Sequence, residues 1–136
     1  MADYTSSTAI PGADPYDADG PTVRAEGLGD IAVSLKQPQL ASLQLLRVHF
    51  RRLSGTGTDT ASLTLDVDSH KGAGFDTRLK TITGAGVSAD VNMRIPRDEL
   101  DAWTIGSRDA LQVNWTNPDA LGEIAWGLEA WLVRPR

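Results

Sequence analysis

The sequence predicts an all-β protein, an antiparallel β-sandwich of about eight short strands that is jelly-roll-like and carries an extended N-terminal arm. Three observations support this fold class. Apolar and polar residues alternate in short runs, turn-forming residues separate these runs at roughly 8–12-residue spacing, and long amphipathic helical patterns are missing. The length of 136 residues suits one domain.

The alternating runs are bounded mostly by Gly, Pro, Asn and Asp. The expected strands cover residues 31–36, 43–53, 61–68, 75–84, 90–96, 110–118 and 123–135. A single helical turn is expected at 97–103, where Leu100 and Trp103 are three residues apart. The last run could be mistaken for a helix, but Gly127 and the neighbouring β-favouring residues favour a strand.

Residues 1–30 differ in amino-acid composition from the remainder of the chain. They are rich in Asp, Gly, Pro, Ser, Thr and Ala, and they hold six acids against one base, Arg24. This segment therefore accounts for the whole net charge of −5. We expect two parts: an acidic arm over residues 1–30 and a β-sandwich domain over residues 31–136.

The arm has few side chains that could anchor it on a partner surface. The expected anchors are large apolar or aromatic residues, namely Tyr4, Ile10, Tyr16 and Val23. Two placements stay open: the arm packs along its own domain, or it lies on a neighbouring subunit. Fully extended, 30 residues would reach about 100 Å, which is enough for either.

A basic stripe is expected on the strand at 43–53. Arg47, His49 and Arg51 alternate on one face, with Arg52 beside them. The stripe either binds an acidic partner or is a solvated face that resists edge pairing. The acidic arm of another copy would complement it, which fits self-association.

The tryptophans lie in the last third of the chain. The positions of Trp126 and Trp131 differ by an odd number, so the two side chains cannot share one face of a regular strand. If Trp126 is in the core, Trp131 faces outward, where it would serve as an interface anchor or as a platform for sugar stacking.

The stretch Asp66-Val-Asp68-Ser-His70-Lys-Gly72 is the part of the sequence that most resembles a chemical site. The side chains of Leu63, Leu65 and Val67 are expected to point into the core. The carboxylates of Asp66 and Asp68 should therefore face solvent, about 6.7 Å apart. The pattern of a calcium loop is not met. We therefore expect a strand end and a turn, with no metal, no cofactor and no catalytic residue.

Composition excludes further classes of site and partner. The chain has no cysteine and only two histidines, and it lacks nucleophile and phosphate-loop motifs. The neutral body argues against nucleic acid. No apolar run is long enough to span a membrane, and the first residues do not resemble a signal peptide. An enzyme is the least favoured class.

Several segments resemble small virion structural proteins of tailed bacteriophages, and most closely capsid decoration (cement) proteins. The resemblance spans roughly residues 45–133 and is carried by Asp76-Thr77-Arg78-Leu79, Asp90-Val91-Asn92, Arg94-Ile95-Pro96, Trp115-Thr116-Asn117-Pro118 and Trp126-Gly127-Leu128. It implies a β-sandwich or jelly roll that forms homotrimers, binds the major capsid protein on the outer capsid surface and strengthens the head.

The predicted function is therefore that of a non-enzymatic capsid decoration protein. The expected contact residues are those of the arm, together with Arg47, Arg51 and Trp131. Two alternatives remain. One is a carbohydrate-binding module that uses Trp131 with Asp66 and Asp68, and the other is a different virion part, such as a tail tube, tail terminator or head-completion protein.

Overall fold

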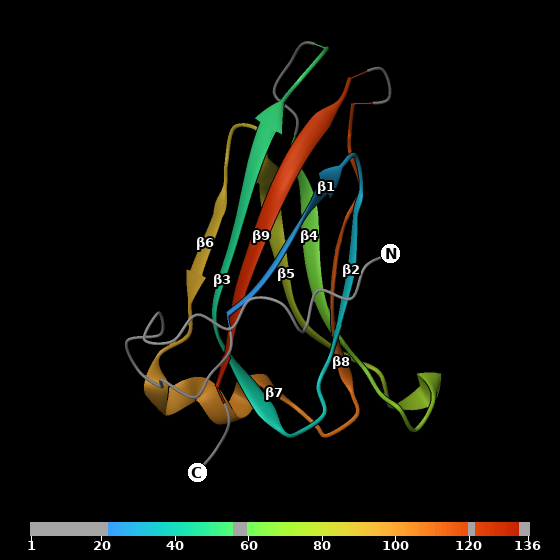
Figure 1. Cartoon of the computed structure of the whole chain (residues 1–136), viewed down its shortest axis with the longest axis vertical. Helices are drawn as coiled ribbons and strands as arrows, with labels where there is room; N and C mark the ends of the chain where they lie inside the picture. Colours follow the sequence, from blue (N-terminus) through green and yellow to red (C-terminus); the bar gives the residue numbers. More distant parts are fainter. Residues whose placement is uncertain (1–21, 56–59, 120–121, 134–136) are drawn as a thin grey trace.

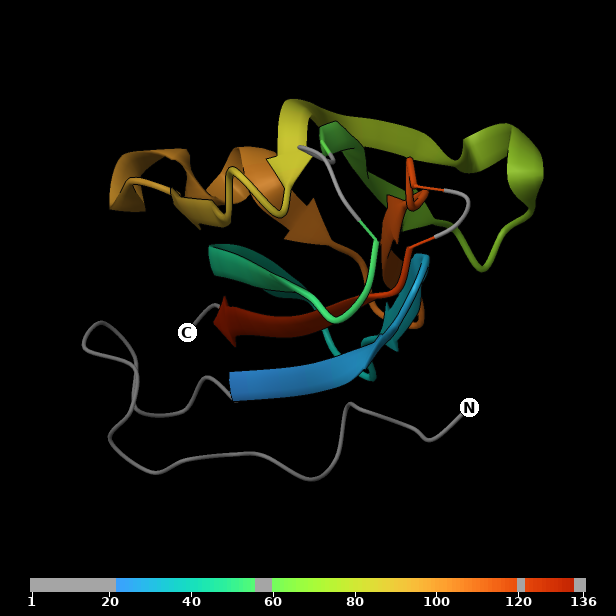
Figure 2. The ribbon, with the colours of Figure 1, turned by 90° about the horizontal axis from the view of Figure 1, so that it is seen from above.

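The computed structural model describes residues 22–55, 60–119 and 122–133. They form two β-sheets that face each other (Figure 1). The elements are β1 (Thr22–Leu28), β2 (Ile31–Lys36), β3 (Ala41–Arg52), β4 (Thr60–Asp68), η1 (Ala73–Phe75), β5 (Thr77–Gly86), β6 (Val91–Arg94), η2 (Arg97–Trp103), β7 (Thr104–Ile105), β8 (Ala110–Trp115) and β9 (Ile124–Val133). The view along the strands shows the two layers (Figure 2).

The strand order identifies the sandwich as a jelly roll. Sheet A has the order β1-β9-β3-β6, with the short β7 also pairing with β3, and sheet B has the order β2-β8-β4-β5. All pairings are antiparallel. If β7 is left out and the remaining strands are renumbered from one to eight along the chain, sheet A has the order one, eight, three, six and sheet B has the order two, seven, four, five. This is the strand order of a jelly roll built from two Greek keys. The predicted fold class is confirmed.

The core lies between the sheets and follows the predicted alternation. Leu63, Leu65 and Val67 of β4 all point inward, with at most 9% exposed. Within the core, Phe50 near the end of β3 and Trp115 at the end of β8 have ring centroids 4.8 Å apart. The indole Nε1 of Trp115 donates to the carbonyl oxygen of Ala85 at 2.8 Å, so this large side chain is buried with its polar atom hydrogen-bonded.

Strand β1 lies within the segment that the sequence assigned to the arm. Residues 22–28 pair along their whole length with β9, and Val23 and Ala25 are 1% and 6% exposed. The sandwich therefore begins at Thr22 rather than after residue 30. The inner face of β1 carries only Val23, Ala25 and Gly27, and this weak apolar pattern is why the strand was missed. The remainder of the expected arm, residues 1–21, lies outside the described residues.

The connection between β4 and β5 also differs from the prediction. The strand expected at 75–84 begins at Thr77, and Phe75 lies in η1 with 64% of its surface exposed. The β4–β5 pairing shifts register between Leu65 and Asp66. The shift breaks the simple alternation, so Leu79 and Ile82 both pack against the core although an odd spacing would place them on opposite faces of a regular strand.

The helical turn predicted at 97–103 is present as η2. It connects β6 to β7, which both pair with β3. Leu100 and Trp103 pack against the core from this element. No helix in the described part of the chain is both long and apolar enough to cross a membrane.

Candidate functional site

The outer face of sheet A carries three of the residues that the sequence marked as contact candidates, Arg47, Arg51 and Trp131. Because Leu46, Val48 and Phe50 point inward from β3, the intervening Arg47, His49 and Arg51 point outward. On β9, Gly127, Glu129 and Trp131 share this outer face, and on β1 so do Arg24 and Glu26. The predicted placements of Arg47, Arg51 and Trp131 on an outward face agree with the structure.

An ion-pair row crosses three neighbouring strands of this face, β1, β9 and β3. Arg24 and Arg47 both lie opposite Glu129 in the strand register. Nε of Arg24 is 3.0 Å from Oε2 of Glu129, and Nη1 of Arg47 is 3.7 Å from Oε1. The Glu129 side chain is 22% exposed, whereas the two arginines are about half-exposed. Both guanidinium groups therefore keep unused N–H donors directed at solvent.

Next to this row lies a shallow hollow of about 520 Å³. Its floor is Gly127, which lies opposite Glu26 of β1 and His49 of β3. A Cβ atom at Gly127 would have no heavy atom within 4 Å. The hollow exists because residue 127 has no side chain, and its rim is formed by the charged groups of Arg24, Glu26, Arg47, His49 and Glu129.

His49 is held at the far side of the hollow by Asp90, which precedes β6. Nδ1 of His49 is 2.5 Å from Oδ2 of Asp90, and the other carboxylate oxygen accepts the backbone N–H of Phe50 at 3.0 Å. Asp90 therefore extends the β3–β6 contact beyond its last backbone pair, Val48 with Val91. No sequence pattern indicates this pairing, because the two residues are 41 positions apart.

Trp131 lies on the outer face beyond the ion-pair row, opposite Leu45 of β3. Its side chain is partly buried, and its Nε1 is buried without a hydrogen-bond partner among the described residues. Leu45 is only 1% exposed although it lies on this outer face. The partly exposed Trp131 thus adjoins the charged area on the same sheet, whereas Leu45 beside it is covered.

Two predicted contact sets have different outcomes. Val23 was expected to anchor the arm on a partner, but its side chain is 1% exposed and belongs to the domain's own core. Tyr4, Ile10 and Tyr16 lie outside the described residues. Arg52, expected beside the basic stripe, instead turns toward the loop after β8.

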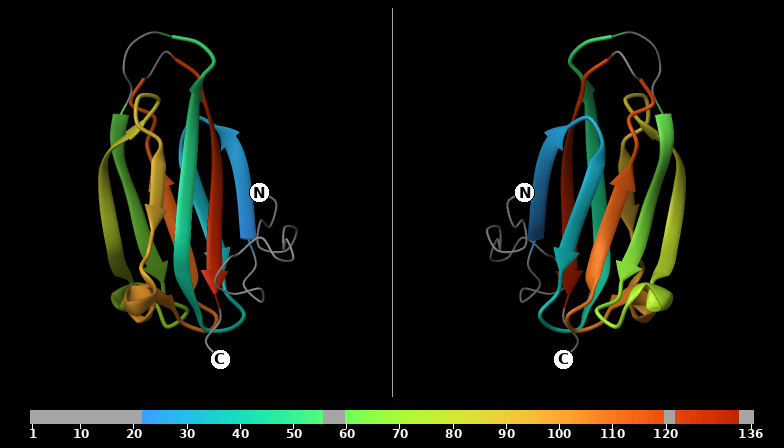
Figure 3. Two further views of the ribbon diagram at one scale, coloured as in Figure 1. Left: turned by 90° about the vertical axis from the view of Figure 1, so that its left-hand side faces the viewer. Right: turned by 90° about the vertical axis from the view of Figure 1, so that its right-hand side faces the viewer.

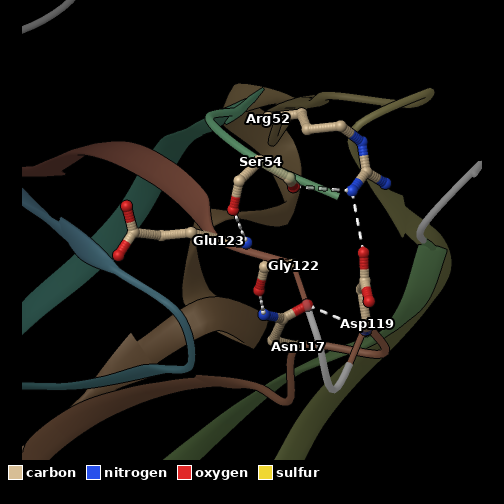
Figure 4. A network of polar contacts seen from close by, with 6 residues as sticks. All are labelled: Arg52, Ser54, Asn117, Asp119, Gly122 and Glu123. Carbon is tan, nitrogen blue, oxygen red and sulfur yellow. Dashed lines mark hydrogen bonds and ion pairs between the residues drawn. The ribbon is translucent and has the colours of Figure 1, made fainter. Parts of the chain in front are cut away.

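At that end of the sandwich, Arg52 takes part in a polar network (Figure 4). Its Nη1 donates to Oδ2 of Asp119 at 2.8 Å and to the carbonyl oxygen of Ser54 at 3.1 Å. Asn117 accepts the N–H of Asp119 and donates to the carbonyl oxygen of Gly122. This network joins the end of β3 to the β8–β9 connection.

The stretch around Asp66, Asp68 and His70 does not form one site. Asp66 pairs with Arg78, and Asp68 accepts a hydrogen bond from Gln112 at 3.3 Å. His70 is bound instead to Asp109, whose Oδ1 contacts both the backbone N and Nδ1 of His70 at 3.0 and 2.5 Å. No group of three or more potential metal ligands occurs among the described residues.

The contacts from His70 affect the acidity of Asp109. The backbone N–H of His70 and then its imidazole hydrogen-bond to the carboxylate, and they hold the pKa of Asp109 below its usual 3.8, while burial acts in the opposite direction. Asp109 was missed at the sequence level because it is 39 residues from His70. The pair closes two loops at the end of the sandwich opposite to the network of Arg52.

Comparison with known proteins adds little to this description. No protein-family model matches the sequence, and no curated protein matches it. Among solved structures, a chain of infectious bursal disease virus, Gx strain, aligns with 93% of this chain and 37% of its own length, at 17% identity and a TM-score of 0.35. This chain thus spans well under half of that viral chain, and the alignment is too loose to carry a functional argument.

Proposed function

We propose that this chain is a non-enzymatic virion structural protein, and specifically a capsid decoration protein of a tailed bacteriophage that binds the outer capsid lattice. The observation that carries the proposal is the outer face of sheet A. It combines half-exposed guanidinium groups at Arg24 and Arg47 with the partly exposed Trp131 on one face of the sheet. Aromatic and arginine side chains are enriched at protein interfaces.

The fold is compatible with this role. Jelly rolls occur in viral capsid domains, and also in lectins and cupins, so the fold alone does not decide between them. The contacts of the histidines favour a structural role over catalysis. His49 and His70 each bind one carboxylate, at separate places, and neither is hydrogen-bonded to a hydroxyl group in the described residues.

In the proposed assembly, the chain forms a homotrimer that sits on the major capsid protein. Tyr4, Ile10 and Tyr16, which lie outside the described residues, are proposed as further contacts with the capsid protein. Many copies with modest individual affinity then stabilise the head together, because each bound oligomer raises the effective concentration of its other contacts.

A capsid-binding assay with charge-reversal variants tests the proposal. Capsids stripped of this protein are incubated with the wild type, Arg47→Glu and Lys80→Glu, and the bound copies are quantified. Lys80 is an exposed cation on β5 of the other sheet, so it is the matched control. We expect Arg47→Glu to weaken binding at least about tenfold and Lys80→Glu to bind as the wild type does.

Wild-type protein that fails to bind the capsid, or an unchanged affinity of Arg47→Glu, would refute the proposal. Cryo-electron microscopy of the native particle gives the position directly. Density on the outer lattice at three-fold or quasi-three-fold positions is expected, whereas ring-shaped assemblies away from the capsid would favour a tail or head-completion component.

The carbohydrate-binding alternative is less well supported. Trp131 lies on β9 of sheet A, whereas Asp66 and Asp68 lie on β4 of sheet B. These residues belong to opposite layers of the sandwich and cannot surround one sugar.

A further inference from the structure

Strand β1 forms an edge of sheet A and pairs only with β9 among the described residues. It is seven residues long, and it lies next to β2 at one side of the sandwich (Figure 3). An edge strand presents unpaired backbone N–H and C=O groups and is a template for pairing with another chain, unless short length, bulges, proline or inward charges prevent it.

The other edges are protected or lack complementary charges. β6 has only four residues. β5 pairs with β4 through two register shifts and contains Gly84 and Gly86 with positive φ. β2 is regular, but Lys36 is its only charged residue. In contrast, β1 contains no proline, pairs with β9 without a shift, and carries one cation and one anion.

The hydrogen bonds between β1 and β9 show which backbone N–H and C=O groups of β1 point away from sheet A. The N–H of Gly29, directly after the strand, donates to the carbonyl oxygen of Ile124 at 2.8 Å. Backbone groups of alternate residues point to opposite sides of a strand. Those of Ala25 and Gly27 therefore point toward β9, and those of Arg24 and Glu26 point away from the sheet.

The order of charges along β1 is complementary to itself. When a second copy of β1 is placed antiparallel to the first about a two-fold axis at Ala25, Arg24 lies opposite Glu26 of the second copy, and Glu26 lies opposite Arg24. These are also the residues whose backbone groups face the open edge, so the two pairs would exchange about four backbone hydrogen bonds. Opposite charges directly across two strands are stabilising.

Glu26 is an exposed carboxylate with no ion-pair partner among the described residues. Arg24 uses its Nε on Glu129, which leaves its terminal nitrogens for a second carboxylate. We propose that β1 pairs with β1 of a second copy, so that the two A sheets form one continuous sheet across a two-fold axis. This contact does not depend on the proposed capsid function, since it would form in solution without capsids.

The test uses the full-length chain in sedimentation velocity across roughly three decades of concentration. The wild type is expected to form dimers, or even-numbered oligomers if a three-fold contact is also present. Glu26→Arg places only cations on the edge, and Arg24→Glu places only anions there. Each variant alone is expected to raise the dissociation constant at least about tenfold, because two attractive pairs become two repulsive pairs.

Mixing supplies the decisive comparison. Equal amounts of Glu26→Arg and Arg24→Glu should recover the dimer as a heterodimer, and the double variant Arg24→Glu with Glu26→Arg should recover it within one chain. Lys80→Glu, which reverses an exposed charge on β5 of the other sheet, is the control and should dimerise as the wild type does. Far-ultraviolet circular dichroism verifies that each variant is folded.

A wild type that stays monomeric, or that forms only odd-numbered oligomers, would overturn the inference. So would a dimer that neither single variant weakens, or a mixture that stays monomeric while both variants are folded. Because capsids are absent from these measurements, failure here leaves the capsid-binding test unaffected, and the converse also holds.

Discussion

Trp126 and Gly27 face each other across the β1–β9 ladder, and the indole ring fills the space that a side chain at residue 27 would occupy. A Cβ atom at Gly27 would lie 2.7 Å from Cζ2 of Trp126. Gly127, the next residue along β9, is the opposite case, since a Cβ atom there would meet nothing within 4 Å. Neither glycine has a positive φ, so steric contact alone distinguishes them.

This difference predicts the effect of adding one methyl group at each glycine. Gly27→Ala should lower the free energy of unfolding by about 1–3 kcal/mol, because the core must shift to accept it. Gly127→Ala should leave it unchanged or raise it by up to about 1 kcal/mol, because alanine reduces the entropy of the unfolded chain. Urea unfolding measures both, and equal losses would contradict this account of Trp126.

The position of β1 predicts which N-terminal truncation is tolerated. A chain that begins at Thr22 should remain folded, because residues 22–133 include all the described strands. A chain that begins at Asp30 loses β1 with the buried side chains of Val23 and Ala25, which should cost at least about 3 kcal/mol. Thermal unfolding followed by circular dichroism separates the two, and similar melting temperatures would show that β1 is dispensable.

The arginines Arg51 and Arg52 are adjacent in sequence but differ in environment. Arg52 and Asp119 have side chains that are 18% and 14% exposed and form a charge-assisted hydrogen bond. Arg52→Ala should therefore lower the free energy of unfolding by about 1–3 kcal/mol. Arg51→Ala, on the exposed outer face, should change it by less than about 0.5 kcal/mol.

A double-mutant cycle of Arg52→Ala and Asp119→Ala gives the coupling between the two side chains. The expected coupling is favourable and at least about 0.5 kcal/mol. A coupling near zero would mean that the network in Figure 4 does not contribute to stability.

The lowered pKa of Asp109 predicts a pH dependence of stability. A carboxyl group whose pKa is lower in the folded state stabilises the fold at pH values above its unfolded pKa, and this contribution disappears as the pH falls through the folded pKa. Asp109→Asn should thus be less stable than the wild type by about 1 kcal/mol at neutral pH. The difference should shrink below about pH 4.

Denaturant unfolding at several pH values between neutral and acidic measures this difference. Asp101→Asn is the matched control, since Asp101 is an exposed carboxylate of η2, and it should show a small and nearly constant difference. If the difference in the free energy of unfolding between the wild type and Asp109→Asn is as large in acid as at neutral pH, the ionised carboxylate is not its cause.

The fold was accessible from the sequence because burial on one face of a strand imposes alternation. Leu63, Leu65 and Val67 on β4 show it, and the odd spacing of Trp126 and Trp131 correctly placed them on opposite faces. Strand β1 escaped detection because its inner residues beyond Val23 are only Ala25 and Gly27, which add little hydrophobic signal.

The candidate site was only partly predictable. The outward direction of Arg47 follows from its own strand, but its neighbours Glu129 and Arg24 are set by register between segments far apart in the chain. The hollow at Gly127 has no sequence signal of its own, because it arises from a missing side chain among neighbours supplied by three strands.

The pairing of β1 with β9 has a consequence for biosynthesis. These are the first and last described strands, so β1 has no partner in its own sheet until the final strand leaves the ribosome. The β4–β5 hairpin, by contrast, joins neighbouring segments and can form early. Contacts between distant segments slow folding, so we expect closure of sheet A, by the pairing of β1 with β9, to be among the last steps of folding.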